Sequence, residues 1–301
     1  MEDLEGKTVF VTGGASGIGL GIASAFVDAG TNAVLADVDP VRLEGALGRF
    51  EQDGKRDRVH GVQLDVCDRE AFARAADEAE QAFGDVHVLV NNAGVGLLGP
   101  LKDARYDDWD WGLGVMLGGV VNGIQTFLPR LLRHGQGGHI VNTSSMAGLL
   151  PIGGAAIYVA AKAALIGLSE SMRGELAGTG IGVSAFCPGV VQSNIRESGR
   201  LRPERYRGDS GYLELERKLE ERPDSPHWMD PGECGERVLA GVRRNDLYIL
   251  THPEFRQGLE ERFQAILASF PDEPPDTARA ETVPFLLSNP IFREELDKLR
   301  R

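Results

Sequence analysis

The stretch Val9–Gly19, "VFVTGGASGIG", decides the fold of this 301-residue chain. A short apolar, β-branched run ends in glycine, and a helical pattern begins at Gly17. Glycines at positions 13, 17 and 19 leave room for backbone amides and a helix N-terminus to approach a pyrophosphate, which larger side chains would block. The stretch therefore predicts a nucleotide-binding turn, in the spacing TGxxxGxG rather than GxGxxG.

Outward from this turn, apolar runs alternate with helical patterns as far as Pro188. Runs that are apolar on both faces are typical of parallel strands covered by helices, joined by right-handed crossovers. The expected strands lie in residues 32–39, 59–66, 85–94, 137–145 and 181–189. This alternation predicts an α/β fold with a Rossmann-like, doubly wound parallel sheet in a single domain.

The chain changes character after Gly189, where Arg, Glu and Pro become frequent. We expect one domain, 1–301, in four parts. These are a cofactor-binding and catalytic core at 5–190, a helical substrate-lid insertion at 194–230, a return helix and strand at 231–250, and a C-terminal helical extension at 251–301.

Composition narrows the class of protein. A formal net charge of -13 argues against nucleic acid and an anionic membrane as partners. Three cysteines show no metal-ligand or disulfide spacing, so we expect free thiols, no metal site and a reducing cytoplasm. The uncharged run 111–129 approaches membrane length, but its five glycines favour a helix buried between subunits.

Asp37 ends the second expected strand, 18 residues after Gly19. A carboxylate there can accept hydrogen bonds from both adenosine ribose hydroxyls and would repel a 2′-phosphate. Val38 follows it, and Ser16 rather than a basic residue sits in the glycine turn, so NAD is favoured over NADP. The ordinary alternative is a carboxylate that caps a strand end. Asp65, with its neighbour Val66, could reach the adenine edge or be a simple loop carboxylate.

The segment "YVAAK" places Tyr158 and Lys162 four residues apart, on one face of an expected helix. A phenol has an ordinary pKa near 10, and a neighbouring ammonium and a cationic nicotinamide both favour its phenolate. Tyr158 could then act as general acid and base for an alcohol or ketone oxygen. The pair alone is a weak pattern, but Ser145 precedes it by 13 residues, after a strand.

Together with "TGGASGIG", "NNAG" (91–94) and "PGVVQS" (188–193), this set resembles the classical short-chain dehydrogenase/reductase family over residues 5 to 250. The resemblance implies that Ser145 binds the substrate oxygen, Tyr158 exchanges its proton, and Lys162 holds the nicotinamide ribose and lowers the Tyr158 pKa. Ser144 is the rival of Ser145. The expected NAD-binding set is Gly13, Ser16, Gly17, Ile18, Gly19, Asp37, Asp65, Val66, Asn91, Asn92, Ala93, Gly94, Tyr158, Lys162, Pro188, Gly189, Val191 and Ser193.

One position departs from the family pattern. Met116 in "GVMLGG" stands where the family has an asparagine that holds a water linking the lysine to solvent. A thioether cannot replace that amide. Asn122 lies six residues on, about 120° away around the helix, and is no substitute. Two hypotheses remain: an active enzyme with a weakened proton relay, or a protein that binds NAD and a ligand without turnover.

The expected substrate site is apolar. Val95, Leu97 and Met146 join Ser145 and Tyr158, which suits a hydrophobic, aromatic secondary alcohol or ketone; the same residues could simply be core. The tail from Tyr248 resembles that of bacterial C-alpha dehydrogenases of lignin-type aryl ethers, while hydroxysteroid and general carbonyl reduction stay open. Five arginines of the insertion are expected to form a solvated face, or else to meet a substrate carboxylate: Arg196, Arg200, Arg202, Arg205 and Arg207.

The family resemblance also implies assembly. Family members pair through the helices that correspond here to residues 111–132 and 155–176. The glycine-rich, uncharged run fits a helix packed against another subunit, so we expect a homodimer or homotetramer.

Overall fold

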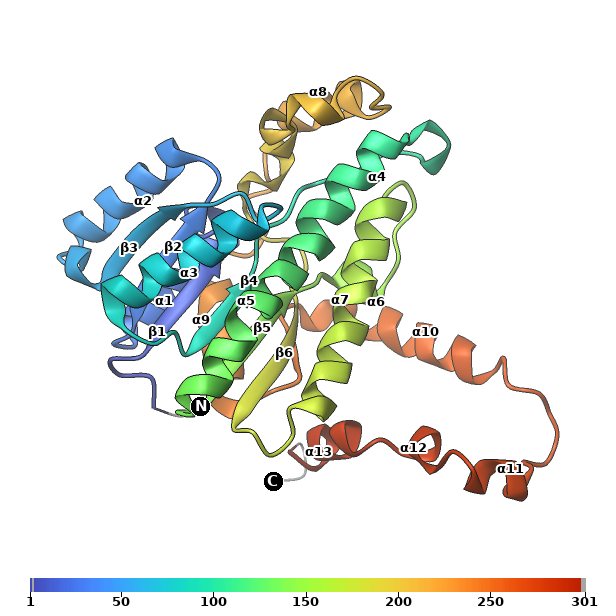
Figure 1. Ribbon diagram of the computed structural model, residues 1–301. Helices are drawn as coiled ribbons and strands as arrows, with labels where there is room; N and C mark the ends of the chain where they lie inside the picture. The colour runs from blue at the N-terminus through green and yellow to red at the C-terminus, as the bar shows by residue number, and fades with distance from the viewer. Residues whose placement is uncertain (2, 299–301) are drawn as a thin grey trace.

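A computed structural model describes residue 1 and residues 3–298 of the chain. Its centre is a seven-stranded sheet of parallel strands in the order β3-β2-β1-β4-β5-β6-β7 (Figure 1). The strands are β1 (Thr8–Thr12), β2 (Asn32–Asp37), β3 (Val59–Gln63), β4 (Val88–Asn91), β5 (Gly138–Thr143), β6 (Ile181–Cys187) and β7 (Tyr248–Leu250). The order reverses between β1 and β4, and ligands of doubly wound sheets bind at the carboxyl ends of the strands beside such a reversal. The predicted fold class is confirmed.

Alternation along β1 shows why helices cover both faces of the sheet. Val9 and Val11 enter an apolar cluster on one face with Phe26 and Val238, whereas Phe10 enters the opposite cluster with Phe72. Successive side chains of a strand point to opposite faces, so a fully apolar strand needs cover on both. The covering helices are α1 (Gly17–Asp28), α2 (Pro40–Gln52) and α9 (Pro231–Arg244) on one face, and α3 (Arg69–Phe83), α5 (Gly119–His134) and α7 (Ala156–Glu175) on the other.

Short elements line the loops at the carboxyl edge of the sheet. They are η2 (Leu101–Asp103), α4 (Tyr106–Leu113), the π-helical turn η3 (Gly114–Gly118) and α6 (Met146–Leu149). The short turn η1 (Arg56–Arg58) lies at the other edge, directly before β3. Since α4, η3 and α5 follow one another directly, residues 106–134 form one long interrupted helix. Of the described residues, this run is the one helix that length and composition would allow to cross a membrane, and 44% of its apolar window is buried in the protein.

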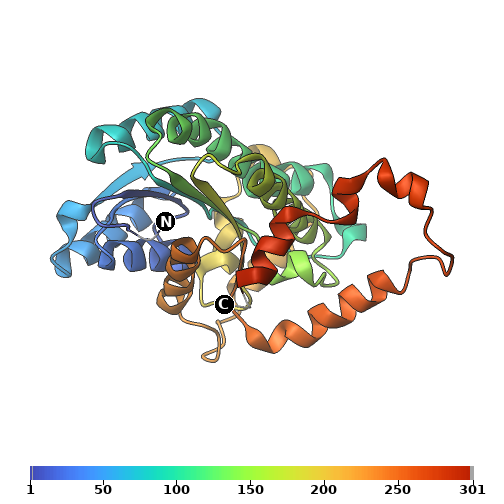
Figure 2. The same cartoon turned by 90° about the horizontal axis from the view of Figure 1, so that it is seen from below.

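Two segments lie outside this core. Residues 194–230, here called the insertion, contain η4 (Asn194–Leu201), η5 (Glu204–Tyr206) and α8 (Leu213–Glu220). After η6 (Pro253–Phe255) the chain leaves the body as α10 (Arg256–Leu267), α11 (Thr277–Glu281), α12 (Pro284–Leu287) and α13 (Pro290–Lys298). Figure 2 shows these last helices projecting to one side and returning to the body at α13. Residues 256–298 are called the C-terminal arm.

Candidate active site

The glycine turn after β1 has no room for side chains. Gly13 adopts a left-handed backbone, φ 62°, and a Cβ added there would lie 3.0 Å from Cα of Ala93. A Cβ on Gly19 would lie 2.1 Å from the Gly13 carbonyl oxygen. Helix α1 begins at Gly17, and the preceding Ser16 makes no side-chain capping bond. The first amides of the helix and the cleft-lining Gly17 therefore suit a diphosphate, which is the fit that a dinucleotide requires.

Asp37 lies at the carboxyl end of β2 and lines the same cleft. Its two carboxylate oxygens accept hydrogen bonds from the backbone N–H of Ala15 at 3.2 Å and of Asp39 at 3.1 Å. Burial raises the pKa of Asp37, and these two bonds oppose that effect. The side chain is thus fixed in place beside the glycine turn, with an accepting group aimed at that part of the cleft.

Arg42 borders the cleft next to Asp37, a contact that the sequence pattern did not indicate. Its guanidinium forms an ion pair with Asp39 at 3.2 Å and another with Glu197 of the insertion at 2.6 Å. The arginine is therefore held between two carboxylates. This pairing also joins the insertion to the nucleotide end of the core.

The end of β4 is tied to the end of β1. The hydroxyl oxygen of Thr12 accepts hydrogen bonds from the backbone N–H of Asn92 at 2.9 Å and of Ala93 at 3.0 Å. Asn92, Ala93 and Gly94 line the cleft. Asn91 points the other way, is 2% exposed, and donates to the Asn142 side chain at 2.9 Å.

Helix α7 carries Tyr158 and Lys162 into the cleft. The Lys162 ammonium lies 5.6 Å from the centre of the Tyr158 ring and donates to the Thr143 carbonyl oxygen at 2.7 Å. The Ser145 side chain hydrogen-bonds Tyr158. The three side chains that the sequence placed in two separate segments thus meet in one site.

Burial sets the proton affinities of this site. Desolvation raises the pKa of Tyr158, and the hydrogen bond with Ser145 acts to lower it. Desolvation lowers the pKa of Lys162 to about 8, and the only opposing influence of note is the nearby Cys187. Lys162 is 3% exposed, so a protonated lysine here is a poorly hydrated cation close to the phenol.

The two neighbouring serines have different surroundings. Ser144 lines the cleft, but its hydroxyl donates to the Lys162 carbonyl oxygen at 2.6 Å. Ser145 is 9% exposed; its hydroxyl oxygen caps α6 by accepting from the Ala147 N–H at 3.1 Å, and it bonds Tyr158. The hydroxyl beside the phenol is therefore that of Ser145.

Met116 lies within the π-helical turn and is fully buried. It packs with Trp111, Leu97 and Ile157 in an apolar cluster that includes Ala161, the neighbour of Lys162. Asn122 points elsewhere and donates to the Val66 carbonyl oxygen at 2.9 Å. This side of the site, next to the lysine-bearing helix, is consequently built from apolar side chains.

The insertion is fastened by a buried cluster of charges. The Arg202 guanidinium forms an ion pair with Asp108 of α4 at 3.0 Å and with Glu216 of α8, and it lies 4.3 Å from the centre of the Trp111 ring. All three charged side chains are nearly inaccessible. Neither sequence interpretation of the arginines describes Arg202, because it belongs to no solvated face and its partners already neutralise it. Arg205 does border the cleft, with an exposed side chain.

Several expected residues are not part of the cleft lining among the described residues. Gly19 lies against the Gly13 carbonyl and the Asn92 side chain, Gly189 contacts His252, and Val191 is buried in the core cluster. Ser145 is also outside the lining, next to Tyr158. Leu97 and Met146 belong to buried apolar clusters. The lining adds residues that the motifs did not indicate: Arg42, Trp111, Val115, Thr143, Asn194, Ile195, Ser198, Leu201, Pro203 and Arg205. In the described part of the chain, no group of three His, Cys, Asp or Glu side chains could hold a metal ion.

The chain belongs to the short-chain dehydrogenase family, whose model matches residues 7–203. It is therefore an oxidoreductase of a family that works with nicotinamide cofactors and small-molecule substrates. The resemblance predicted from the motifs is confirmed.

Individual relatives within the family are similar to this chain over most of its length. C alpha-dehydrogenase of Sphingobium sp. strain NBRC 103272 / SYK-6 is 46% identical over 271 residues, covering 89% of this chain and 88% of the relative. The structure of apo LigD from Sphingobium sp. strain SYK-6 is 40% identical, with a TM-score of 0.75 over 90% of this chain and 100% of that chain. A Burkholderia phymatum short-chain dehydrogenase/reductase solved with NAD is 34% identical, with a TM-score of 0.83 over 92% and 100%.

Proposed function

We propose that this protein is an NAD-dependent dehydrogenase that interconverts a hydrophobic, aromatic secondary alcohol and its ketone. The observation that carries the proposal is the position of Tyr158 and Lys162 on the cleft that also contains Asp37 and the glycine turn, with the Ser145 side chain bonded to Tyr158. A bound nicotinamide would take up or supply the hydride. The protein's own residues would hold the substrate oxygen and move its proton.

The proton step rests on the Tyr158 hydroxyl. In oxidation the phenolate removes the proton of the substrate hydroxyl, and in reduction the phenol returns it to the carbonyl oxygen. The Ser145 hydroxyl donates to the same substrate oxygen and keeps it next to the phenol. Because an ordinary phenol is protonated at neutral pH, the nearby Lys162 cation favours the charged form of Tyr158 in a site where desolvation opposes it.

A preference for NAD over NADP follows from the charges around Asp37. The carboxylate is fixed where it can accept bonds from a ribose, and it would repel a 2′-phosphate. The nearby Arg42 cannot offset this repulsion freely, since Glu197 and Asp39 already pair with it. We expect Asp37→Ser combined with Glu197→Gln to weaken NAD binding and strengthen NADP binding, each by about tenfold or more. Titration of both cofactors into wild type and variant, with Glu204→Gln as an exposed control, checks this.

The substrate class is supported by the apolar part of the cleft. The cleft that contains Tyr158 is also lined by apolar side chains, which suit an aromatic ring better than a charged group: Val95, Trp111, Val115, Ile195 and Leu201. The 46% identity to a C alpha-dehydrogenase favours benzylic alcohols over steroids or simple carbonyls as the first compounds to test.

A weakened proton relay is the second part of the proposal. Met116 occupies the position of the family asparagine and is packed among apolar side chains, so it offers no donor or useful acceptor near the lysine. Proton exchange with solvent is then slower than in a relative with the amide. The same observation supports an alternative function, in which the chain binds NAD and a ligand without turnover.

A homodimer or homotetramer is also proposed. The exposed side of α7 consists of small residues at helical spacing, which permits close approach of a second helix: Ala160, Ala163, Ala164, Gly167 and Ser171.

A turnover assay distinguishes an active dehydrogenase from a protein that binds NAD without catalysis. Purified protein with NAD and a panel of secondary alcohols, including 1-arylethanols and benzylic aryl-ether alcohols, should form NADH, measured at 340 nm. Tyr158→Phe should bind NAD normally and form none. Failure of every alcohol and ketone in the panel, with NAD still bound by the wild type, would establish the binding function instead.

A further inference from the structure

One side of α10 is an apolar surface that its own chain leaves largely uncovered. Leu259, Phe263, Ile266, Leu267 and Phe270 recur every three or four residues, so they lie along one side of the helix and its final turn. Leu259 packs on the body, in the apolar cluster next to the catalytic serine. The other four are 48–72% exposed. An amphipathic helix of this length is marginal in water without something to cover its apolar side.

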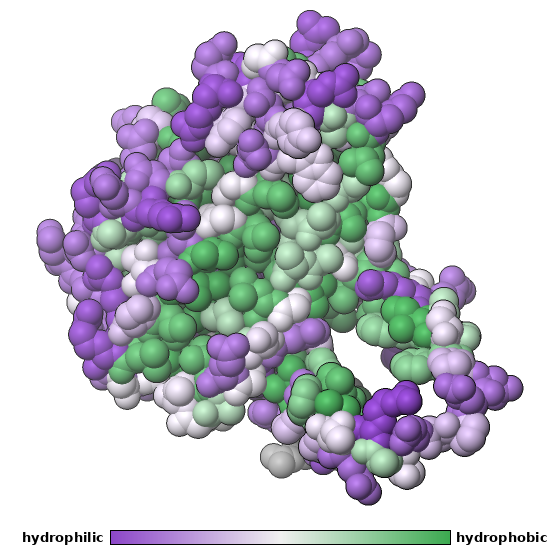
Figure 3. All heavy atoms as spheres, turned by 45° about the vertical axis from the view of Figure 1, so that its right-hand side comes forward, coloured by the Kyte–Doolittle hydropathy of each residue, from purple (hydrophilic) through white to green (hydrophobic). Residues whose placement is uncertain are grey.

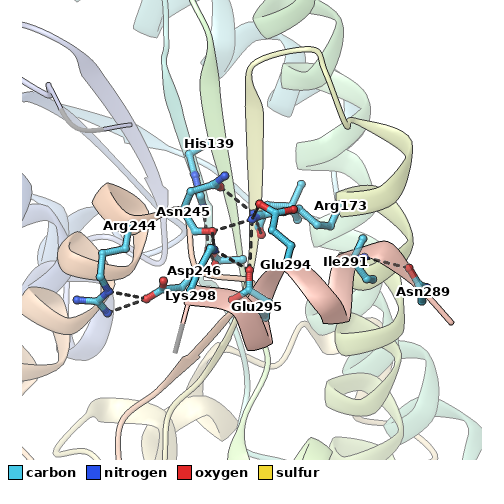
Figure 4. A network of polar contacts seen from close by, with 12 residues as sticks. His139, Arg173, Arg244, Asn245, Asp246, Asn289, Ile291, Glu294, Glu295 and Lys298 are labelled. Atoms are coloured by element: carbon cyan, nitrogen blue, oxygen red, sulfur yellow. Dashed lines mark hydrogen bonds and ion pairs between the residues drawn. The ribbon is translucent and has the colours of Figure 1, made fainter. Parts of the chain in front are cut away.

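The arm is nevertheless held at both ends. At its base, Arg262 donates a hydrogen bond to the Leu149 carbonyl oxygen. At its far end, α13 packs against α7 with Ile291 buried (Figure 4). Its course is therefore set by the fold of the chain.

Polar contacts around the buried Arg173 hold α13 in place. Arg173 is 6% exposed and forms ion pairs with Glu294 at 3.6 Å and Glu295 at 3.4 Å (Figure 4). Lys298 reaches Glu295 at 2.7 Å and also donates to the Asn245 carbonyl oxygen. An arginine this well enclosed makes α13 a specific anchor for the arm.

Between these anchors the arm stands away from the body. Residues 263–279 are all exposed, and Ile291 is the one buried residue of the described arm. Figure 3 shows an open gap between the arm and the rest of the molecule, with apolar side chains on the arm near it. A second apolar group, Phe285, Leu286 and Leu287, is 66–74% exposed.

The exposed apolar area is the size of an interface. Nine apolar side chains of the arm are 40–74% exposed: Phe263, Ile266, Leu267, Phe270, Phe285, Leu286, Leu287, Phe292 and Leu296. At roughly 100 Å² each, they present on the order of 900 Å², against about 800 Å² per partner in a standard protein interface. Isolated monomers rarely leave this much apolar surface in water.

Charge counts against an anionic lipid surface, and the charges within α10 do not oppose a second copy. Residues 256–298 contain nine Asp or Glu and five Lys or Arg, so anionic headgroups would repel the arm. Within α10 itself, Arg256 and Arg262 balance Glu260 and Glu261, and two such helices meet without net repulsion. Apolar rows at this spacing can pack ridges into grooves against an identical row, in the reciprocal contact of a twofold dimer.

We propose that the C-terminal arm clasps a second copy of this chain, with the apolar side of α10 as the centre of the contact. This interface is separate from the small-residue side of α7 and does not depend on which substrate the enzyme uses. Because Leu259 and Arg262 of α10 contact the segment 146–149 that follows Ser145, the contact would also hold that segment from outside.

The test compares two pairs of substitutions that add the same charge to the end of α10 and the turn that follows it. Leu267→Glu with Phe270→Glu alters the apolar side, and Gln264→Glu with Ala268→Glu alters the opposite side. All four positions are exposed, so neither pair disturbs the folded monomer. In sedimentation velocity over a concentration series, we expect the first pair to raise the dimer dissociation constant at least tenfold. The second pair should leave it at the wild-type value.

Hydrogen exchange gives an independent readout on the unmodified chain. Amides of residues 259–270 should exchange more slowly as the wild-type concentration rises through its dissociation constant. Unchanged exchange across that range overturns the proposal, as does a wild-type monomer at micromolar concentration. Equal association by both variant pairs, or a monomer that floats with phosphatidylcholine vesicles through these residues, overturns it as well.

Discussion

Two helices pack against each other beside the active site, and they contribute different kinds of side chain to it. Helix α7 brings Tyr158 and Lys162, a titratable phenol and a nearly inaccessible ammonium. The interrupted helix of residues 106–134 brings Trp111, Val115 and the buried Met116. The difference suggests that α7 supplies the proton chemistry and that the neighbouring helix excludes water.

The sharpest test of this division removes the phenol oxygen. We expect Tyr158→Phe to lower kcat by about 10³-fold, the range found for positioned acid–base groups, because no side chain on the neighbouring helix can take its place. Steady-state NADH formation measures the loss, and an unchanged NAD affinity shows that the cleft is intact. Retention of more than a tenth of the activity would contradict the assignment.

The position of the helix of residues 106–134 depends on the buried ion pairs of Arg202 with Asp108 and Glu216. Arg202→Met leaves Asp108 and Glu216 as unpaired buried carboxylates, so we expect a loss of about 3 kcal/mol in the free energy of unfolding. Denaturant titration gives this value. Arg200→Met, which removes a more exposed ion pair, serves as the control and should cost less than about 1 kcal/mol.

On α7, we expect Lys162 to support catalysis and at the same time to lower the stability of the fold. Burial lowers the pKa of Lys162 from 10.5 to about 8, so between these pH values the unfolded chain binds more protons and stability rises with pH. Below pH 8 the full cost of the buried charge is present. Lys162→Met should therefore raise the free energy of unfolding at pH 7 by about 2 kcal/mol after the lost hydrogen bond to Thr143 is deducted, and abolish most activity.

The pH dependence checks the cause of that stabilisation. The difference between variant and wild type should shrink as pH rises from 8 towards 10.5, measured by denaturant titration at each pH. A difference that stays constant over this window would show that the buried charge is not responsible.

The smallest effect concerns residue 116 in the helix of residues 106–134, where a methionine stands in place of the asparagine of the family. Met116→Asn should raise kcat by about threefold to tenfold, while the buried amide costs about 1–3 kcal/mol of stability. Met116→Leu keeps the site apolar and should change neither quantity by much. Equal kcat in all three proteins would mean that residue 116 takes no part in proton transfer.

Sequence patterns predicted the sheet and the positions of the glycine turn, Asp37, Tyr158 and Lys162, because local spacing fixes each of them. Patterns did not separate Asn91 from Asn92, although successive residues at a strand end point to opposite faces, and Asn92 alone of the two lines the cleft. The burial of Arg202 was also beyond reach, since its partner Asp108 lies 94 residues away in the chain.

The same limit applies to the C-terminal arm. Its apolar spacing is visible in the sequence and reads as an ordinary core-facing helix. Only the fold shows that Phe263, Ile266, Leu267 and Phe270 on that side stay exposed.

The most direct test of the account measures kcat of the wild type and of Met116→Asn against the concentration of a small buffer base, at fixed pH and ionic strength. If Tyr158 and Lys162 carry the chemistry and Met116 slows only the exit of the proton, imidazole buffer should raise the wild-type rate severalfold and leave Met116→Asn, already fast, unchanged. A wild-type rate that is independent of buffer and equal to that of Met116→Asn would contradict the account.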